Sequence, residues 1–199
     1  PEVYREMNAI FQSRQELVMR IAAHDADLAV TALRQTRFQN DSAIRIRNNF
    51  NYQNEANLEM NVANLIAGKD PAAALKLARS SLSRGVSWNV ISFLPQLYQK
   101  DQKSGQALYQ EIVTKIKDEN LTRNTDLANN AWNLLTSFQP PQADEDTFKD
   151  LLTVMVANLF TINRQTQGGI GTAHNLYYQI ERIAPLIEKY APSRTAELR

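Results

Sequence analysis

The sequence predicts an all-α fold of about nine helices, arranged as antiparallel hairpins that stack into an irregular, solenoid-like superhelix. Two observations predict the helices. Apolar residues recur at spacings of three and four along most of the chain, and no segment alternates between apolar and polar residues as a strand does. Turn residues are scarce, with 6 glycines and 7 prolines among 199 residues, whereas an all-β chain needs frequent turns.

The first two helices are predicted from one apolar stripe and one capping residue. The stripe of the first helix consists of residues that follow the helical period: Val3, Met7, Ile10, Phe11, Leu17, Val18 and Ile21. Asp25 then precedes a second apolar pattern, and aspartate is a preferred residue at the N-cap of a helix. We therefore expect a helical hairpin that turns at Asp25.

Glycines and an aspartate–proline pair bound the next two helices. A long helix is expected from about residue 42 to residue 67, with Gly68 as its stop. Asp70-Pro71 predicts the start of the following helix, because a proline at the first helical position needs no hydrogen-bond partner. That helix is expected to stop at Gly85.

Caps and prolines also define the helices in the middle of the chain. Ser87 precedes a helix over 88–99, which we expect Pro95 to kink or shorten. Asp101 opens the next helix, and a pair of prolines ends the helix expected around 127–138.

Negative charge and glycine bound the last two helices. Asp144, Glu145 and Asp146 are consecutive, and negative charge is favourable in the first turn of a helix. Segment 165–171 contains three glycines and is expected to form a flexible loop. A last helix is expected over 172–190.

A weak repeat relates three of these helix junctions. At each junction a basic residue or a histidine stands directly before an aspartate: His24-Asp25, Lys69-Asp70 and Lys100-Asp101. A small residue follows four positions after each aspartate: Ala29, Ala74 and Gly105. The aspartates are 45 and 31 residues apart, which lies within the range of helical-hairpin repeats that bury their apolar faces on one another. Small residues at these positions favour close approach between helices.

Several segments of residues 17–117 carry a resemblance to known sequences: Asp27-Leu28-Ala29, Leu33-Arg34-Gln35-Thr36-Arg37, Asp70-Pro71-Ala72-Ala73-Ala74-Leu75-Lys76-Leu77-Ala78-Arg79 and Gly85-Val86-Ser87. This part of the chain resembles a set of uncharacterised, often exported, bacterial helical-repeat proteins. The aspartate–alanine–leucine pattern is more loosely similar to tetratricopeptide units, without their tryptophan–leucine–glycine–tyrosine core and with irregular spacing. The resemblance implies a helical superhelix and export to the periplasm or the cell exterior, and it carries no catalytic residue.

Composition excludes several classes of function. The formal charge of +1 does not favour binding to nucleic acid through a general electrostatic field. Because there is no cysteine, the chain has no disulfide, no thiol nucleophile and no thiolate metal cluster. No stretch approaches the ~20 apolar residues of a membrane span. We expect one helical domain over 1–199, a mature form or a fragment of a longer precursor because the chain begins at Pro1.

An asparagine stripe is the most informative polar feature. Asn54, Asn57, Asn61 and Asn64 follow the helical period, about 100° around the helix from an apolar stripe. Uncharged amides beside a core indicate a semi-buried ladder or the wall of a groove, and an amide can both donate to and accept from an extended peptide. Two tryptophans, Trp88 and Trp132, are candidates to contribute to the same site. The alternative is that the tryptophans belong to the core and the amides bond locally.

Other constellations carry weaker signals. Neither His24 nor His174 has a glutamate or a second histidine three or four positions later, so no metal site is expected, and no cofactor motif is present. The glycines of Gly168-Gly169-Ile170-Gly171 lack the preceding strand and following lysine of a phosphate-binding loop. A basic cluster is interpreted as a solvated turn, or else as a contact for an acidic partner or phosphate: Arg34, Arg37, Arg45 and Arg47.

These observations favour a non-enzymatic interaction module that binds a protein or peptide. One alternative is a helical accessory domain of a larger enzyme. Another is a helical enzyme that uses scattered carboxylates, which predicts a deep pocket and acidic residues with raised pKa values.

Overall fold

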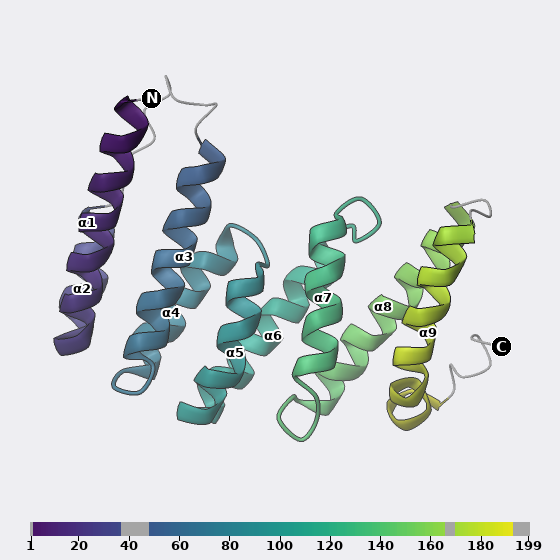
Figure 1. The fold of residues 1–199 in the computed structure, drawn as a ribbon. Coiled ribbons are helices and arrows are strands. Elements are labelled where there is room, and N and C mark those ends of the chain that lie inside the picture. The colour runs from purple at the N-terminus through teal and green to yellow at the C-terminus, as the bar shows by residue number, and fades with distance from the viewer. Residues whose placement is uncertain (1, 37–47, 166–169, 193–199) are drawn as a thin grey trace. The chain divides into compact units, whose positions relative to one another are not determined.

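The structure is a computed structural model that describes residues 2–36, 48–165 and 170–192. Over these ranges the protein is all-α, with nine helices and no strand, which confirms the predicted fold class (Figure 1). In chain order the helices are α1 (Glu2–His24), α2 (Ala26–Gln35), α3 (Asn48–Ile66), α4 (Pro71–Ser83), α5 (Trp88–Lys100), α6 (Gln102–Asp118), α7 (Thr125–Ser137), α8 (Glu145–Gln165) and α9 (Ile170–Tyr190).

Packing divides the chain into two compact units. Unit 1 comprises residues 1–108 and unit 2 comprises residues 109–199, and the boundary lies inside α6. The single domain expected over 1–199 stays a prediction, as does stacking of all the helices into one superhelix.

Within each unit the helices pack mainly on their neighbours in the sequence. In unit 1, α1 packs on α2 and α3, while α3 also packs on α4 and α5. In unit 2, α8 packs on both α7 and α9. Helices joined by short turns and packed on the next helix, or the next but one, are the local arrangement expected of helical hairpins.

Two predicted aspartate caps are confirmed. The Oδ1 atom of Asp25 accepts from the N–H of Leu28 at 2.9 Å, and that of Asp70 accepts from the N–H of Ala73 at 2.9 Å. Pro71 occupies the start of α4 as expected. These bonds satisfy N–H groups that have no partner inside the helix, so they fix the point where each helix begins.

Asp101 forms a related arrangement at the start of α6. Its carboxylate accepts from the N–H of Lys103 at 3.1 Å and from the hydroxyl of Ser104 at 2.5 Å. Ser87 lies at the N-cap position of α5 as expected, but its side chain makes no capping hydrogen bond.

Two helix ends follow the predicted glycine stops. Helix α4 ends at Ser83, and Gly85 has a φ of 143°, in the region that side chains other than glycine rarely adopt. Helix α3 ends at Ile66, just before Gly68. The start expected near residue 42 for this helix lies outside the described residues.

Pro95 does not shorten α5, contrary to one of the two expected outcomes. The helix continues to Lys100. Leu94 and Leu97 are fully buried on either side of the proline, so packing of this turn holds the helical path where one backbone hydrogen bond is missing.

The core of unit 1 contains two ion pairs among its aliphatic side chains. Arg14 of α1 pairs with Glu55 of α3, and Arg84 pairs with Glu59 of α3. Both glutamates are buried. The surrounding core includes Val18, Leu33, Leu58, Val62, Ile66, Leu77, Val90, Phe93, Leu94 and Leu97.

The core of unit 2 contains two aromatic contacts. The ring centroids of Tyr109 and Phe138 are 5.2 Å apart, and those of Phe148 and Tyr190 are 5.0 Å apart in an edge arrangement. These contacts connect α6 to the end of α7 and α8 to the end of α9.

Candidate functional site: the exposed face of α3 and α5

The asparagine stripe of α3 faces solvent. Asn57, Asn61 and Asn64 are exposed, while Leu58 and Val62, about 100° around the helix, are buried. Asn54 lies in α3, but its side chain is outside the described residues. The stripe therefore forms a surface rather than the semi-buried ladder that was one of the expected arrangements.

A hydrogen bond connects this stripe to α5. The side-chain amide of Asn89 donates to Oδ1 of Asn57. Helices α3 and α5 pack on each other within unit 1, so this bond joins two neighbouring surface stripes into one face.

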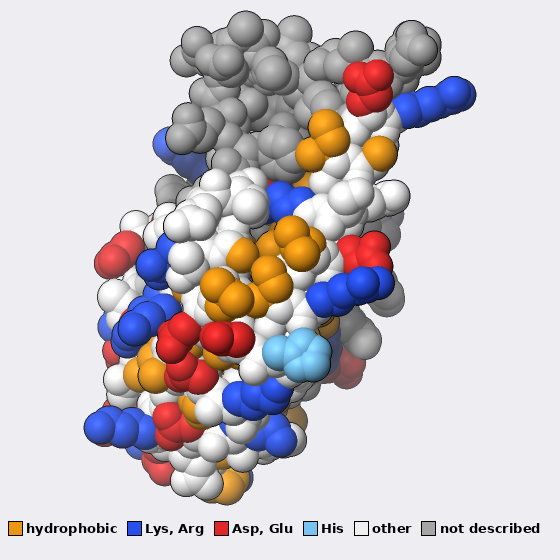
Figure 2. All heavy atoms as spheres, turned by 90° about the vertical axis from the view of Figure 1, so that its left-hand side faces the viewer, with side chains coloured by type: hydrophobic (Ala, Val, Ile, Leu, Met, Phe, Trp, Pro, Cys, Tyr) orange, Lys and Arg blue, Asp and Glu red, His pale blue; other side chains and the backbone are white. Residues whose placement is uncertain are grey.

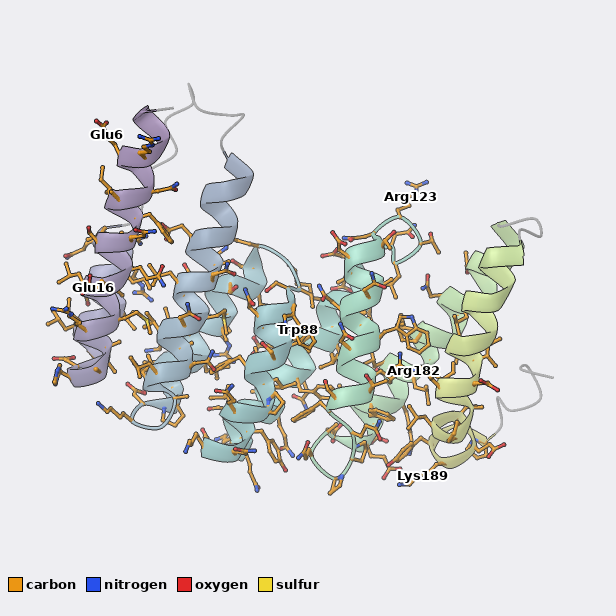
Figure 3. The ribbon with its side chains drawn as sticks, viewed as in Figure 1. Glu6, Glu16, Trp88, Arg123, Arg182 and Lys189 are labelled. Carbon is orange, nitrogen blue, oxygen red and sulfur yellow. The ribbon has the colours of Figure 1, made fainter. Side chains whose placement is uncertain are left out.

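The two candidate tryptophans lie in contrasting environments. Trp88 begins α5, next to Asn89, and is 54% exposed (Figure 3). Trp132 lies in α7 of unit 2, is 8% exposed, and therefore contributes to core packing. Of the two, only Trp88 offers a large aromatic surface to a partner.

The exposed residues of α5 beyond Trp88 were not predicted as part of this face. Ser92, Gln96 and Gln99 are exposed at the same helical spacing as Trp88. Leu65, 40% exposed, lies beside Asn61 and Asn64 on α3. The helical spacing of Trp88, Ser92 and Gln96 was visible in the sequence, but only burial distinguishes this exposed stripe from the fully buried Phe93 and Leu97.

The face of α3 and α5 is uncharged over the described residues. The exposed side chains of α3 from Asn57 onward are asparagines and one leucine. On α5, the exposed side chains before Lys100 are a tryptophan, a serine and two glutamines. A surface of this kind offers hydrogen-bond donors and acceptors without attracting either sign of charge.

The acidic trio is engaged in helix capping and ion pairing. Oδ1 of Asp144 accepts from the N–H of Thr147 at 2.9 Å and from its hydroxyl at 2.7 Å. Lys149 contacts Glu145 at 2.7 Å and Asp146 at 3.8 Å. The hydrogen bond to Glu145 raises the pKa of Lys149. These contacts support the expectation that the trio serves the first turn of α8.

Two carboxyl groups have lowered pKa values. The pKa of Asp101 is lowered chiefly by the hydrogen bond from the Ser104 hydroxyl, and that of Asp144 by hydrogen bonds from the backbone and side chain of Thr147. A carboxyl group that acts as a general acid needs a shift in the other direction. Neither residue therefore has the raised pKa expected of a helical enzyme that works with carboxylates.

The remaining candidates add no further site. His24 and Arg34 are exposed, while the other members of the basic cluster, the side chain of His174 and residues 166–169 lie outside the described residues. Among the described side chains, no three histidine or acidic groups are placed to hold a metal ion. None of the helices in the described ranges combines the length and the apolar character needed to cross a membrane.

Comparisons with protein-family models, with curated proteins and with solved structures found no match for this chain. The resemblance to bacterial helical-repeat proteins therefore stays an expectation from the sequence.

Proposed function

We propose that the chain is a non-enzymatic helical interaction module that binds a protein or peptide partner across the exposed face of α3 and α5. The observation that carries the proposal is the exposure of Trp88 beside an uncharged stripe of amides. Tryptophan is enriched among the residues that dominate binding energy, because its large rigid surface is costly to leave in water.

The spacing of the amides supports an extended peptide as the partner. Asn57 and Asn61 are separated by about 6 Å along the helix axis. An extended chain advances roughly 6.6 Å over two residues, so the two amides match alternate residues of a peptide laid along α3. Each amide can donate to a peptide carbonyl and accept from a peptide N–H, which favours recognition of the main chain.

Asn57 differs from the other two exposed asparagines of α3, because its side chain accepts a hydrogen bond from Asn89 within the protein. Because Asn57 is bonded within the protein, its replacement is expected to affect both stability and binding. Asn61 and Asn64 are exposed at the same face, so replacing them changes the surface that a partner meets.

The test is selection of peptides from a random display library on the full chain, followed by affinity measurements with variants. Trp88→Ala is expected to weaken the selected peptide at least about thirtyfold, the size of a hot-spot effect. Asn61→Ala/Asn64→Ala is also expected to weaken it. Both variants should keep the melting temperature within a few degrees, because all three side chains are exposed.

Gln106→Ala is the matched control, since it removes an exposed amide from α6. It should leave affinity unchanged. Peptides whose binding is insensitive to Trp88→Ala, or a failure to select any binding peptide, would contradict the proposal.

A further inference from the structure

The outer side of α1 carries an apolar stripe that no described part of the chain covers. Ile10 is 55% exposed and Leu17 is 54% exposed. They are seven residues apart and so share one face of the helix, while Val18 and Ala22 on an adjacent face are fully buried. Leu28 of the neighbouring α2 is 53% exposed.

Figure 2 shows the α1–α2 side of unit 1, where hydrophobic side chains gather in the middle and charged side chains lie around them. An apolar area with a polar rim is typical of a surface that meets another protein.

Charges of opposite sign flank the two ends of this stripe. Glu6 and Arg20 are both exposed, fourteen residues apart on one flank of α1. Arg20, whose side chain is 76% exposed, also contacts Glu16 within the same helix at 2.5 Å. Glu6 and Glu16 lie on the side of α1 away from α3 (Figure 3).

The apolar stripe and the flanking charges of one copy are complementary to those of a second copy related by a two-fold rotation. The midpoint between Ile10 and Leu17 falls between positions 13 and 14, and the midpoint between Glu6 and Arg20 falls at position 13. A two-fold rotation about an axis beside Ser13 therefore places Ile10 on Leu17 of a second copy and Glu6 opposite its Arg20. Both kinds of contact are satisfied by the same axis, as a self-complementary interface requires.

We propose that the outer face of α1 is the interface of a symmetric homodimer, in which α1 packs antiparallel on α1 of a second copy. Ser13, small and exposed, lies where the two helices are closest and permits close approach. A contact built mainly on one helix pair lies at the small end of specific interfaces, which typically bury about 1,600 Å². The dimer is therefore weak and its population depends on protein concentration.

Sedimentation equilibrium of the full chain tests this proposal. The apparent mass of the native chain is expected to rise from monomer toward dimer with concentration. Leu17→Glu should raise the dimer dissociation constant roughly tenfold or more, because it places an unpaired carboxylate against the apolar side chain of Ile10 in the second copy. Leu65→Glu, at an exposed leucine of α3, is the matched control and should dimerise as the native chain does.

Charge reversal tests the register of the two helices. Glu6→Arg alone and Arg20→Glu alone each create two like-charge contacts, so each variant should dimerise less than the native chain. An equal mixture of the two should recover association as a heterodimer, because position 6 of either chain then faces a charge of opposite sign at position 20 of the other. Circular dichroism should show native helix content for every variant, since the replaced side chains are exposed.

Two results would overturn the proposal: a native chain that stays monomeric at millimolar concentration, or a dimer that responds to neither Leu17→Glu nor the charge reversals. Trp88→Ala should leave dimerisation unchanged, so failure of the peptide proposal and failure of this one are separate outcomes.

Discussion

Because Gly105 has no side chain, α6 can pack closely against α5. A Cβ atom placed on Gly105 would lie 2.6 Å from Cα of Tyr98 and 2.7 Å from its Cβ. Backbone atoms cannot withdraw as the end of a side chain can, so only glycine fits at this position. The small residue expected four positions after Asp101 is confirmed as a point of close approach.

Gly105→Ala is therefore expected to destabilise the protein although alanine favours helices. Overpacking costs about 1–3 kcal/mol, whereas the gain in helix propensity is about 1 kcal/mol. Gly68→Ala is the control, because its added Cβ would meet only Cε of Lys100 at 3.8 Å. Urea denaturation should show a lower free energy of unfolding for Gly105→Ala alone, and equal values for the two variants would contradict the contact.

Asp144 is expected to make the stability of the protein depend on pH. Hydrogen bonds from Thr147 lower its pKa in the folded state below the ordinary value. A carboxyl group of this kind stabilises the fold above its unfolded-state pKa, and the contribution is lost as pH falls through the folded-state pKa.

Asp144→Ala should reduce the free energy of unfolding near neutral pH by about 1 kcal/mol, the usual value of an N-cap. The difference from the native protein should shrink as pH falls below about 4, because the native carboxyl group is then protonated. Asp144→Asn keeps a capping side chain and serves as the control. A difference that is constant with pH, measured by urea denaturation at each pH, would contradict this role.

Capping residues were largely predictable from the sequence, whereas exposure was not. Asp25 and Asp70 cap helices as expected because capping depends on local sequence, and Asp144, expected only as negative charge at the start of its helix, caps α8 as well. Asn124 accepts from the N–H of Leu127 in the same way, although it was not predicted. Trp88 and Trp132 carry similar local signals, and only the packing around them separates the exposed ring from the buried one.

At the scale of elements, Arg14 joins three helices of unit 1. Its guanidinium pairs with both carboxylate oxygens of Glu55, and it also donates to the carbonyl of Leu33 at 3.1 Å and to the hydroxyl of Thr36 at 2.8 Å. These bonds connect α1 to the end of α2 and to α3. The bidentate geometry suits arginine and would not be reproduced by lysine.

Arg14→Met should lower the free energy of unfolding by about 3 kcal/mol, because it leaves a buried carboxylate without its partner. Arg14→Met/Glu55→Leu should recover most of that loss by replacing the buried pair with apolar side chains. Both values come from chemical denaturation. A double variant as unstable as Arg14→Met would show that the guanidinium bonds to α2 dominate instead.

The apolar period of α1 predicted the helix but not which of its residues would be covered. Ile10, Leu17 and Val18 belong to one broad stripe in the sequence. In the structure Val18 is buried and the other two are exposed, because neighbouring helices cover only one edge of the stripe. Periodicity predicts the helix and its apolar side, whereas the burial of each apolar residue depends on which other helices pack against it.

At the scale of the whole molecule, the prediction of sequential helices was accurate because most contacts are local. Each helix packs mainly on the next helix or the next but one. The bounds of such helices depend on caps, stop residues and periodicity, which are features of short sequence segments. The division into two units was not predicted. It falls inside α6, where the sequence has neither a glycine–proline linker nor a change in composition.

The candidate site was predicted only in part, because the sequence shows the spacing of residues along one helix but not the packing between helices. The helical spacing of Asn57, Asn61 and Asn64 indicates one stripe, and these residues do share a face. The hydrogen bond from Asn89 of α5 to Asn57 depends on how the two helices pack against each other, which no short segment encodes.

The placement of the two tryptophans gives each unit its own optical reporter. Unit 1 contains Trp88, which is largely in water, and unit 2 contains Trp132, which is shielded. Replacing either indole with phenylalanine leaves a chain whose tryptophan fluorescence comes from one unit alone. The order in which the two halves melt is thus open to direct observation without an added dye.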